Sequence, residues 1–134
     1  MRHNDDFNCS MGASMEGLPI EALKQVAAYF QALSEPTRLH ILSLLRDGER
    51  NVGELAQLCD YTSANISRHL AILSKHGLVA RENRGTSVYY RIADESVYAL
   101  CDLVCGSIAR QFEQTAREQQ AFVQTAGRAK ESKP

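Results

Sequence analysis

No segment of this sequence approaches the roughly 20 consecutive apolar residues that a membrane-spanning helix needs. The first 17 residues contain no hydrophobic run, so a secretory signal is not expected either. These two absences argue against a membrane protein and a secreted protein, and they predict a cytoplasmic one. In the cytoplasm cysteines stay reduced and tend to bind metals or to carry redox chemistry.

An excess of charge of one sign is also lacking. The formal net charge is −1, so the chain as a whole has no electrostatic attraction to nucleic acid. The sequence contains no C-x2-C motif, and no histidine lies close to a cysteine in the sequence to act as its base. We therefore expect a protein that is not an enzyme.

The length of 134 residues suits one domain with a modest core. Apolar residues make up 44% of the chain and charged residues 23%, as in an ordinary globular protein. We expect one folded domain over residues 18–120, between a flexible N-terminal arm (1–17) and a polar C-terminal tail (121–134).

Apolar residues recur at helical spacing in the first part of the chain. The spacing predicts a helix from Pro19 to about Ala32 and a second helix that Ser34 caps and that ends at Asp47-Gly48. The second helix is expected to be strongly buried, through residues Leu39, Ile41, Leu42, Leu44 and Leu45.

The segment from residue 52 to residue 92 has the order helix, turn, helix, hairpin. An amphipathic helix over 52–59, capped by Asn51, precedes a polar break at 60–62 and a second helix from about Ser63 to His76. Two alternating strand segments follow, 78–82 and 87–92, joined by Asn83-Arg84-Gly85-Thr86.

This order is that of a winged helix-turn-helix. With a long final helix from about Glu95 to Gln120, the predicted fold is mainly α with a small β-hairpin. Five basic residues and one acidic residue between Tyr61 and Ile92 leave a local charge of +4 (5 − 1). Concentrated positive charge favours DNA, because neutralising phosphates releases counterions.

The second helix of this unit is the candidate DNA-reading helix. Ile66, Leu70 and Leu73 are spaced to pack inward, which leaves the first turns facing outward. The candidate DNA contacts on and before these turns are Thr62, Ser63, Ala64, Asn65, Ser67, Arg68 and His69. Thr62 and Ser63 suit helix capping equally well, and His69 suits a packing role.

The hairpin turn supplies two further candidates, Arg84 and Thr86. Glycine permits the tight turn, and Arg84 can reach a narrow minor groove, although a solvated hairpin arginine is the simpler alternative. Arg68 can bind guanine or phosphate, and phosphate is favoured because phosphate contacts outnumber base contacts.

The final helix carries an apolar stripe. At about 100° per residue, six residues fall within a sector of roughly 120°: Val97, Leu100, Cys101, Val104, Ile108 and Phe112. Such a stripe on a terminal helix predicts the seam of a homodimer, and a two-fold dimer matches a pseudopalindromic DNA site.

Two thiols also lie on this helix. Cys101 and Cys105 are one turn apart, so their sulfurs can converge on one soft ion, and Cys9 on the N-terminal arm can supply a third ligand. Three thiolates suit trivalent arsenic or antimony better than zinc, which normally takes four ligands. Another thiophilic ion, such as cadmium or lead, stays open. Alternatively, Cys101 is simply a small apolar residue in the seam, and Cys59 is expected to be buried.

The run from Leu33 to Ile92 resembles the ArsR/SmtB family of bacterial metal-responsive repressors. The resemblance is carried by LSEPTRLHILSLL (33–45), ELAQL (54–58), ANISRHLAILSKHGLV (64–79) and the hairpin ending VYYRI. With the flanking helices it covers about residues 18–120. It implies a homodimer joined by the first and last helices, and a repressor that leaves its operator when an inducer binds.

The sequence departs from two patterns of that family. Its arsenic sensors carry a cysteine pair in the helix before the reading helix, where this chain has only Cys59. Its zinc sensors use histidines and carboxylates on the last helix, which here contains no histidine. Some members with separated cysteines respond instead to oxidants or persulfides by forming a disulfide, so a thiol-redox repressor stays an alternative. A further alternative is a winged-helix module used only for protein association, which would show no salt-dependent DNA binding.

Overall fold

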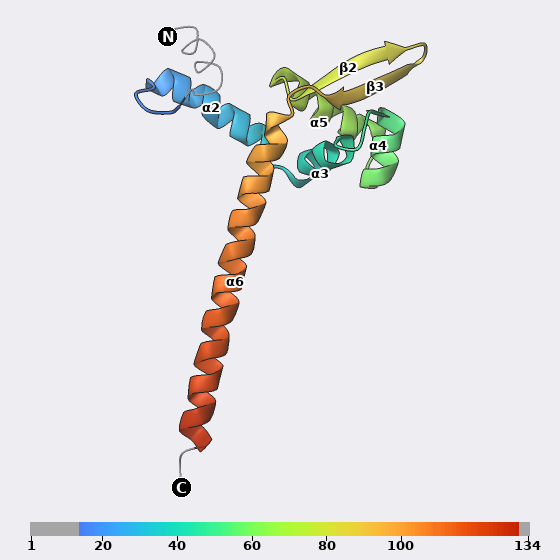
Figure 1. Cartoon of the computed structure of the whole chain (residues 1–134). Helices are drawn as coiled ribbons and strands as arrows, with labels where there is room; N and C mark the ends of the chain where they lie inside the picture. The colour runs from blue at the N-terminus through green and yellow to red at the C-terminus, as the bar shows by residue number, and fades with distance from the viewer. Residues whose placement is uncertain (1–13, 132–134) are drawn as a thin grey trace. The chain divides into compact units, whose positions relative to one another are not determined.

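The computed structural model describes residues 14–131 of the chain. The chain divides into two compact units, of which the first ends at Ala93 and the second begins at Asp94. Within residues 14–93 the chain forms four helices and a small antiparallel sheet, and the second unit is the long helix α6 (Ser96–Glu131) (Figure 1). The predicted fold, mainly helical with a winged helix-turn-helix, is confirmed.

The elements of the first unit follow the predicted order, with one additional strand. They are α2 (Ile20–Leu33), α3 (Pro36–Leu45), β1 (Arg50–Asn51), α4 (Val52–Cys59), α5 (Ser63–Lys75), β2 (Val79–Arg84) and β3 (Ser87–Ile92). No helix in the part of the chain that the structure describes is both long and apolar enough to cross a bilayer.

The N-cap of α3 is Glu35, so the prediction of Ser34 was wrong. The Glu35 carboxylate accepts hydrogen bonds from the backbone N–H groups of Thr37, at 2.6 Å, and Arg38, at 3.1 Å. Pro36 occupies the first helical position, where its missing N–H costs nothing. Ser34 instead donates its hydroxyl to the Gln31 carbonyl at the end of α2.

The predicted cap of α4 is confirmed. Asn51 and Glu54 form a reciprocal capping box, in which each side chain accepts a hydrogen bond from the other residue's backbone N–H, at 2.8 and 2.9 Å. Asp60 ends α4 in the left-handed conformation, with a φ of 55°. That geometry suits an Asp or Asn at a tight turn and directs the chain into α5.

The sheet has three strands, in the order β1-β3-β2, although only the hairpin was predicted. The two residues of β1 pair with Tyr90 and Tyr89 of β3. The β2–β3 ladder runs as far as the pair Arg84–Ser87, so the turn is only Gly85-Thr86, and Asn83 and Arg84 belong to β2 rather than to the loop. Gly85 has a φ of 62°, which the tight turn requires.

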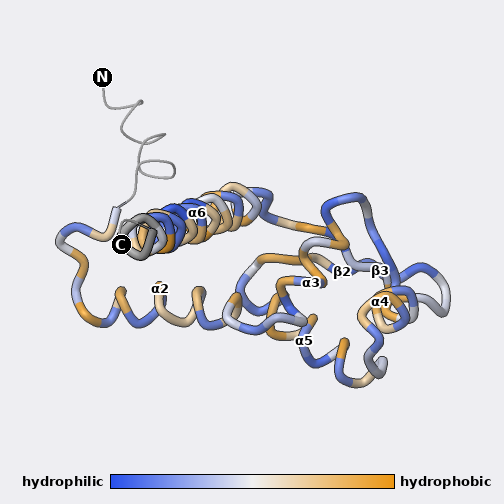
Figure 2. Tube along the Cα trace, turned by 90° about the horizontal axis from the view of Figure 1, so that it is seen from below, coloured by the Kyte–Doolittle hydropathy of each residue, from blue (hydrophilic) through white to orange (hydrophobic). Residues whose placement is uncertain are grey.

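The core of the first unit lies between α3, α4, α5 and the start of the hairpin. Its fully buried side chains are Ile41, Leu45, Leu55, Ile66, Leu70, Leu73 and Leu78. The inward packing predicted for α5 is therefore confirmed. The burial predicted for α3 holds only in part, because Leu39 is 41% exposed. Hydropathy alternates along α2 and α6, as expected for amphipathic helices (Figure 2).

Helix α6 begins near its predicted start and continues well beyond its predicted end. Asp94 accepts hydrogen bonds from the Ser96 backbone N–H, at 3.0 Å, and from the Ser96 hydroxyl, at 2.7 Å. The helix runs past Gln120 to Glu131, so most of the segment predicted as a polar tail is helical. Its Gln, Ala, Arg and Glu residues favour helix strongly enough to outweigh the roughly 1 kcal/mol that Gly127 costs.

Candidate nucleic-acid interface and thiol pair

Helix α5 has two sharply different faces. Ile66, Leu70 and Leu73 on its inner face are completely buried. On the outer side of its first two turns Ser63, Ala64, Ser67 and Arg68 are exposed. Short side chains at the start of a reading helix let its backbone approach the edges of bases in the major groove. The structure thus brings together on one face of α5 four of the residues predicted to face DNA, Ser63, Ala64, Ser67 and Arg68.

Three of the candidate DNA contacts, Thr62, Asn65 and Arg68, form hydrogen bonds with one another at the start of α5. The Thr62 hydroxyl accepts a hydrogen bond from the Asn65 backbone N–H at 3.1 Å, so Thr62 serves as the N-cap of α5. The Arg68 guanidinium donates to the Asn65 side-chain carbonyl on the exposed surface. Asn65 therefore holds the arginine along the outer face of the helix.

His69 points inward, away from the exposed turn. Its side chain is only 12% exposed. Its ring lies 3.2 Å from the Arg38 guanidinium, measured to Nδ1, and it stacks on Tyr61 with ring centroids 6.0 Å apart. This geometry favours the packing role for His69 over a DNA contact.

Arg84 is held by carboxylates at the end of β2. Its Nη2 lies 2.7 Å from a Glu49 oxygen and 3.1 Å from a Glu82 oxygen, and these hydrogen bonds raise the pKa of Arg84. Its guanidinium also lies over the Tyr89 ring, 4.7 Å from the centroid. Glu49 was missed in the local charge count because it precedes the counted segment. The positive charge available at the wing is therefore smaller than predicted, while Thr86 is exposed in the turn.

Glu35 and Arg38, at the start of α3, both lie close to His69, and neither was predicted from the sequence. A glutamate before a proline at a helix start was the available signal. Partial desolvation raises the pKa of Glu35, but the hydrogen bonds from the two backbone N–H groups, with His69 and Arg38 nearby, outweigh it, so the pKa lies below its usual range.

The cysteines differ in environment. Cys59 on α4 is half-buried, and burial raises the pKa of its thiol, which makes it a poor thiolate ligand. Cys101 is half-buried and Cys105 is exposed on α6, and both are thiols rather than disulfides. Cys9, the predicted third ligand, lies outside the described residues. Among residues 14–131, no group of three or more His, Cys, Asp or Glu side chains is placed to hold a metal ion.

Comparison with known proteins identifies the family. A family model described as bacterial regulatory protein, arsR family, matches residues 35–81. The chain is also 36% identical over 99 residues to the HTH-type transcriptional regulator NmtR of Mycobacterium tuberculosis, covering 69% of this chain and 82% of NmtR. The chain belongs to the ArsR/SmtB family of transcriptional regulators.

Solved structures of this family share the fold. Rv0081 of M. tuberculosis matches with a TM-score of 0.65 and 32% identity, covering 75% of this chain and 99% of Rv0081. The domain Mb0332 of Mycobacterium bovis, described as a homodimeric winged helix-turn-helix DNA-binding domain, matches with a TM-score of 0.64 and 37% identity, covering 75% of this chain and 95% of that domain. NmtR is thus described as a transcriptional regulator and Mb0332 as a DNA-binding domain.

We predict that Glu35→Gln destabilises the protein near neutral pH. Because folding lowers the pKa of Glu35, its carboxylate contributes stability above the unfolded-state pKa, and this contribution is lost as the pH falls through the folded-state pKa. Urea unfolding of wild type and variant should therefore differ at pH 7 and converge in acid. Glu21→Gln, on the exposed surface of α2, is the control, and equal curves for Glu35→Gln and wild type at pH 7 would contradict the prediction.

Proposed function

We propose that this chain is a homodimeric transcriptional repressor that reads duplex DNA with α5 and leaves it when a thiophilic ion binds cysteine thiolates. The exposed polar turn of α5, mounted on a completely buried inner face, carries the DNA-binding part of the proposal. Such a protein works in the cytoplasm, and a two-fold dimer matches a pseudopalindromic operator.

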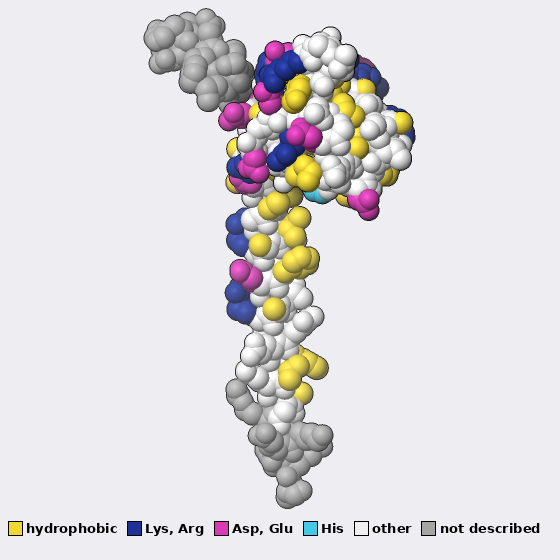
Figure 3. All heavy atoms as spheres, turned by 90° about the vertical axis from the view of Figure 1, so that its right-hand side faces the viewer, with side chains coloured by type: hydrophobic (Ala, Val, Ile, Leu, Met, Phe, Trp, Pro, Cys, Tyr) yellow, Lys and Arg dark blue, Asp and Glu magenta, His cyan; other side chains and the backbone are white. Residues whose placement is uncertain are grey.

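The apolar face of α6 supports a second copy of the chain as its partner. Phe112 is 72% exposed, Phe122 73% and Val123 66%. At about 100° per residue these side chains share a sector roughly 100° wide with Val104 and Ile108. Figure 3 shows hydrophobic side chains along one side of α6 and charged ones along the other. Long helices take most of their stability from packing such a face.

The distal part of this face is not flat. A hollow on α6 is lined by Thr115, Glu118, Gln119, Phe122 and Val123. The first four are spaced i, i+3, i+4 and i+7, which is the set of residues that surrounds an inserted side chain in a coiled coil. The homodimeric domain Mb0332 makes a second copy the favoured occupant.

The thiols lie within the same face. At about 100° per residue, Cys101 falls at the centre of the apolar sector and Cys105 about 40° away, at its edge. An ion bound by both would therefore act directly on the packing of α6. Arsenite and antimonite are the favoured inducers, because three thiolates complete a pyramidal site and Cys9 is a candidate for the third. Shifted packing of α6 would change the distance between the two reading helices of the dimer. The coupling free energy between ion binding and DNA binding is typically 1–3 kcal/mol.

The same residues support one alternative, a repressor that senses oxidants or persulfides. The exposed thiol of Cys105 is accessible to such reagents. Two cysteines separated by one turn of a rigid helix are poorly directed toward each other for a disulfide, which favours the ion-binding function.

DNA binding is tested with a duplex that wild-type protein enriches from a random-sequence library. We expect Arg68→Met to weaken binding and to reduce the slope of affinity against salt by about one, since one phosphate contact is lost. Lys24→Met, which removes the same charge from α2, should leave both unchanged. An Arg68→Met variant with wild-type affinity and slope would argue against a DNA contact by Arg68, and a wild type that enriches no duplex would refute the function.

The thiol site is tested by adding arsenite to the reduced protein bound to this duplex. We expect binding to weaken by about 5- to 150-fold, the range that corresponds to the typical coupling. Cys101→Ser and Cys105→Ser should each abolish the response to arsenite, and Cys59→Ser should retain it. A lost response in Cys9→Ser would identify Cys9 as the third ligand. A wild-type response in both Cys101→Ser and Cys105→Ser would contradict the thiol site. Release of the protein from the duplex by peroxide or polysulfide, but not by arsenite, would establish the redox alternative.

The dimer seam is tested by placing charge on the apolar face of α6. We expect Phe112→Glu and Phe122→Glu to shift the protein toward monomer in sedimentation equilibrium, because each buries an unpaired carboxylate in the seam. Gln124→Glu adds the same charge about 140° away from the centre of the face and should not. Monomeric wild-type protein would contradict the seam, and unchanged association of Phe122→Glu alone would confine the seam to the proximal half of α6.

A further inference from the structure

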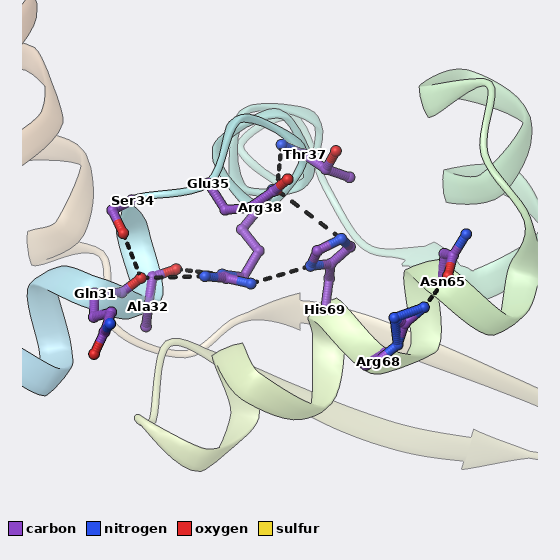
Figure 4. A network of polar contacts seen from close by, with 9 residues as sticks. All are labelled: Gln31, Ala32, Ser34, Glu35, Thr37, Arg38, Asn65, Arg68 and His69. Carbon is purple, nitrogen blue, oxygen red and sulfur yellow. Dashed lines mark hydrogen bonds and ion pairs between the residues drawn. The ribbon is translucent and has the colours of Figure 1, made fainter.

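Arg38, in the first turn of α3, lies at the centre of a contact network that joins three helices (Figure 4). Its Nε is 2.5 Å from the Ala32 carbonyl oxygen and its Nη2 is 3.1 Å from the Gln31 carbonyl oxygen, both in the last turn of α2. Its Nη1 is 3.2 Å from Nδ1 of His69 on α5. One guanidinium therefore binds the end of α2 and the reading helix at the same time.

The contacts with α2 answer a requirement of any helix end. The last carbonyls of a helix have no partner within the helix and need donors from elsewhere. Arg38 donates to the Ala32 carbonyl and, beside the hydroxyl and backbone N–H of Ser34, to the Gln31 carbonyl, through the fixed planar arrangement of its guanidinium. Its orientation is therefore set by α2, and it presents its remaining nitrogen to α5 in a defined direction.

The His69 ring is held on three sides. A guanidinium has only donors, so Nδ1 accepts the hydrogen bond from Arg38, and in the neutral ring the proton is on Nε2. Nε2 faces a Glu35 carboxylate oxygen at 4.0 Å. The face of the ring stacks on Tyr61, with an angle of 17° between the planes. Glu35 is itself fixed by the backbone N–H groups at the start of α3.

A fixed His69 determines how α5 is rotated about its axis. Successive residues of an α-helix are about 100° apart. With His69 turned inward beside the buried Ile66 and Leu70, Arg68 and Ser67 lie on the exposed side. The contact adds a directional hydrogen bond to the apolar packing of α5, which by itself tolerates small rotations.

We propose that Arg38 and His69 are positioning residues for DNA reading, which fix α5 against the end of α2 without touching DNA. The proposal rests on the proposed DNA-binding function of α5. Base contacts need accurate placement of α5, whereas nonspecific phosphate contacts tolerate displacement. Loss of the Arg38–His69 contact should therefore reduce specificity more than it reduces general affinity for DNA.

The test uses the full-length dimer, the duplex enriched by wild type and a scrambled duplex. For Arg38→Met and His69→Leu we expect the ratio of the two affinities to fall about tenfold, as for one poorly read base pair. The salt slope should stay at the wild-type value, in contrast to the reduced slope of Arg68→Met. His69→Asn keeps an acceptor at the position of Nδ1 and should restore much of the ratio, and Lys24→Met is the charge-matched control.

Circular dichroism establishes that each variant is folded, and Arg38→Lys replaces Arg38→Met if the latter is not. The double variant Arg38→Met/His69→Leu should lose no more specificity than either single one, since both remove one interaction. Wild-type specificity in the folded single variants, or a reduced salt slope in Arg38→Met, overturns the positioning role while leaving the proposed function intact. A wild type that binds neither duplex overturns both.

Discussion

The complete burial of Ile66, Leu70 and Leu73 is the constraint on which the rest of the first unit depends. These three side chains fix one face of α5 against the core, and the period of the helix then leaves its polar residues on the opposite face. Removing any of them would leave a cavity and cost several kcal/mol, as large-to-small substitutions in cores do. The chemistry of the outer face is thus a consequence of apolar packing on the inner one.

Polar contacts add direction to that packing. Apolar side chains are non-directional, so they hold a helix in place without defining its rotation to the last few degrees. The Arg38 guanidinium and the His69 ring are planar groups with fixed directions, and carbonyl oxygens, a carboxylate and an aromatic ring surround them. The network joins two well-separated segments of the chain, SEPTR (34–38) and SRHL (67–70), each of which supplies one side of the contact.

The sequence predicted the elements whose signals are local. The box formed by Asn51 and Glu54 and the inward spacing on α5 depend on residues three or four positions apart, and both are present. Strand β1 was missed because two residues have no periodicity, and their pairing with β3 depends on chain nearly 40 residues away. The contacts of Arg84 with Glu49 and of Arg38 with His69 were missed for the same reason. Glu35 was missed as the N-cap of α3 because the neighbouring Ser34 is of a residue type that caps helices more often.

The double use of Asn51 has a mechanical consequence. This residue ends β1, which is paired with the wing strand β3, and it also caps α4, the first helix of the helix-turn-helix. No linker separates the two roles, so the hairpin cannot pivot freely about the helical part. In the proposed DNA complex, contacts of the wing and of the helices with one duplex would then form and break together, because the two parts move as one rigid body.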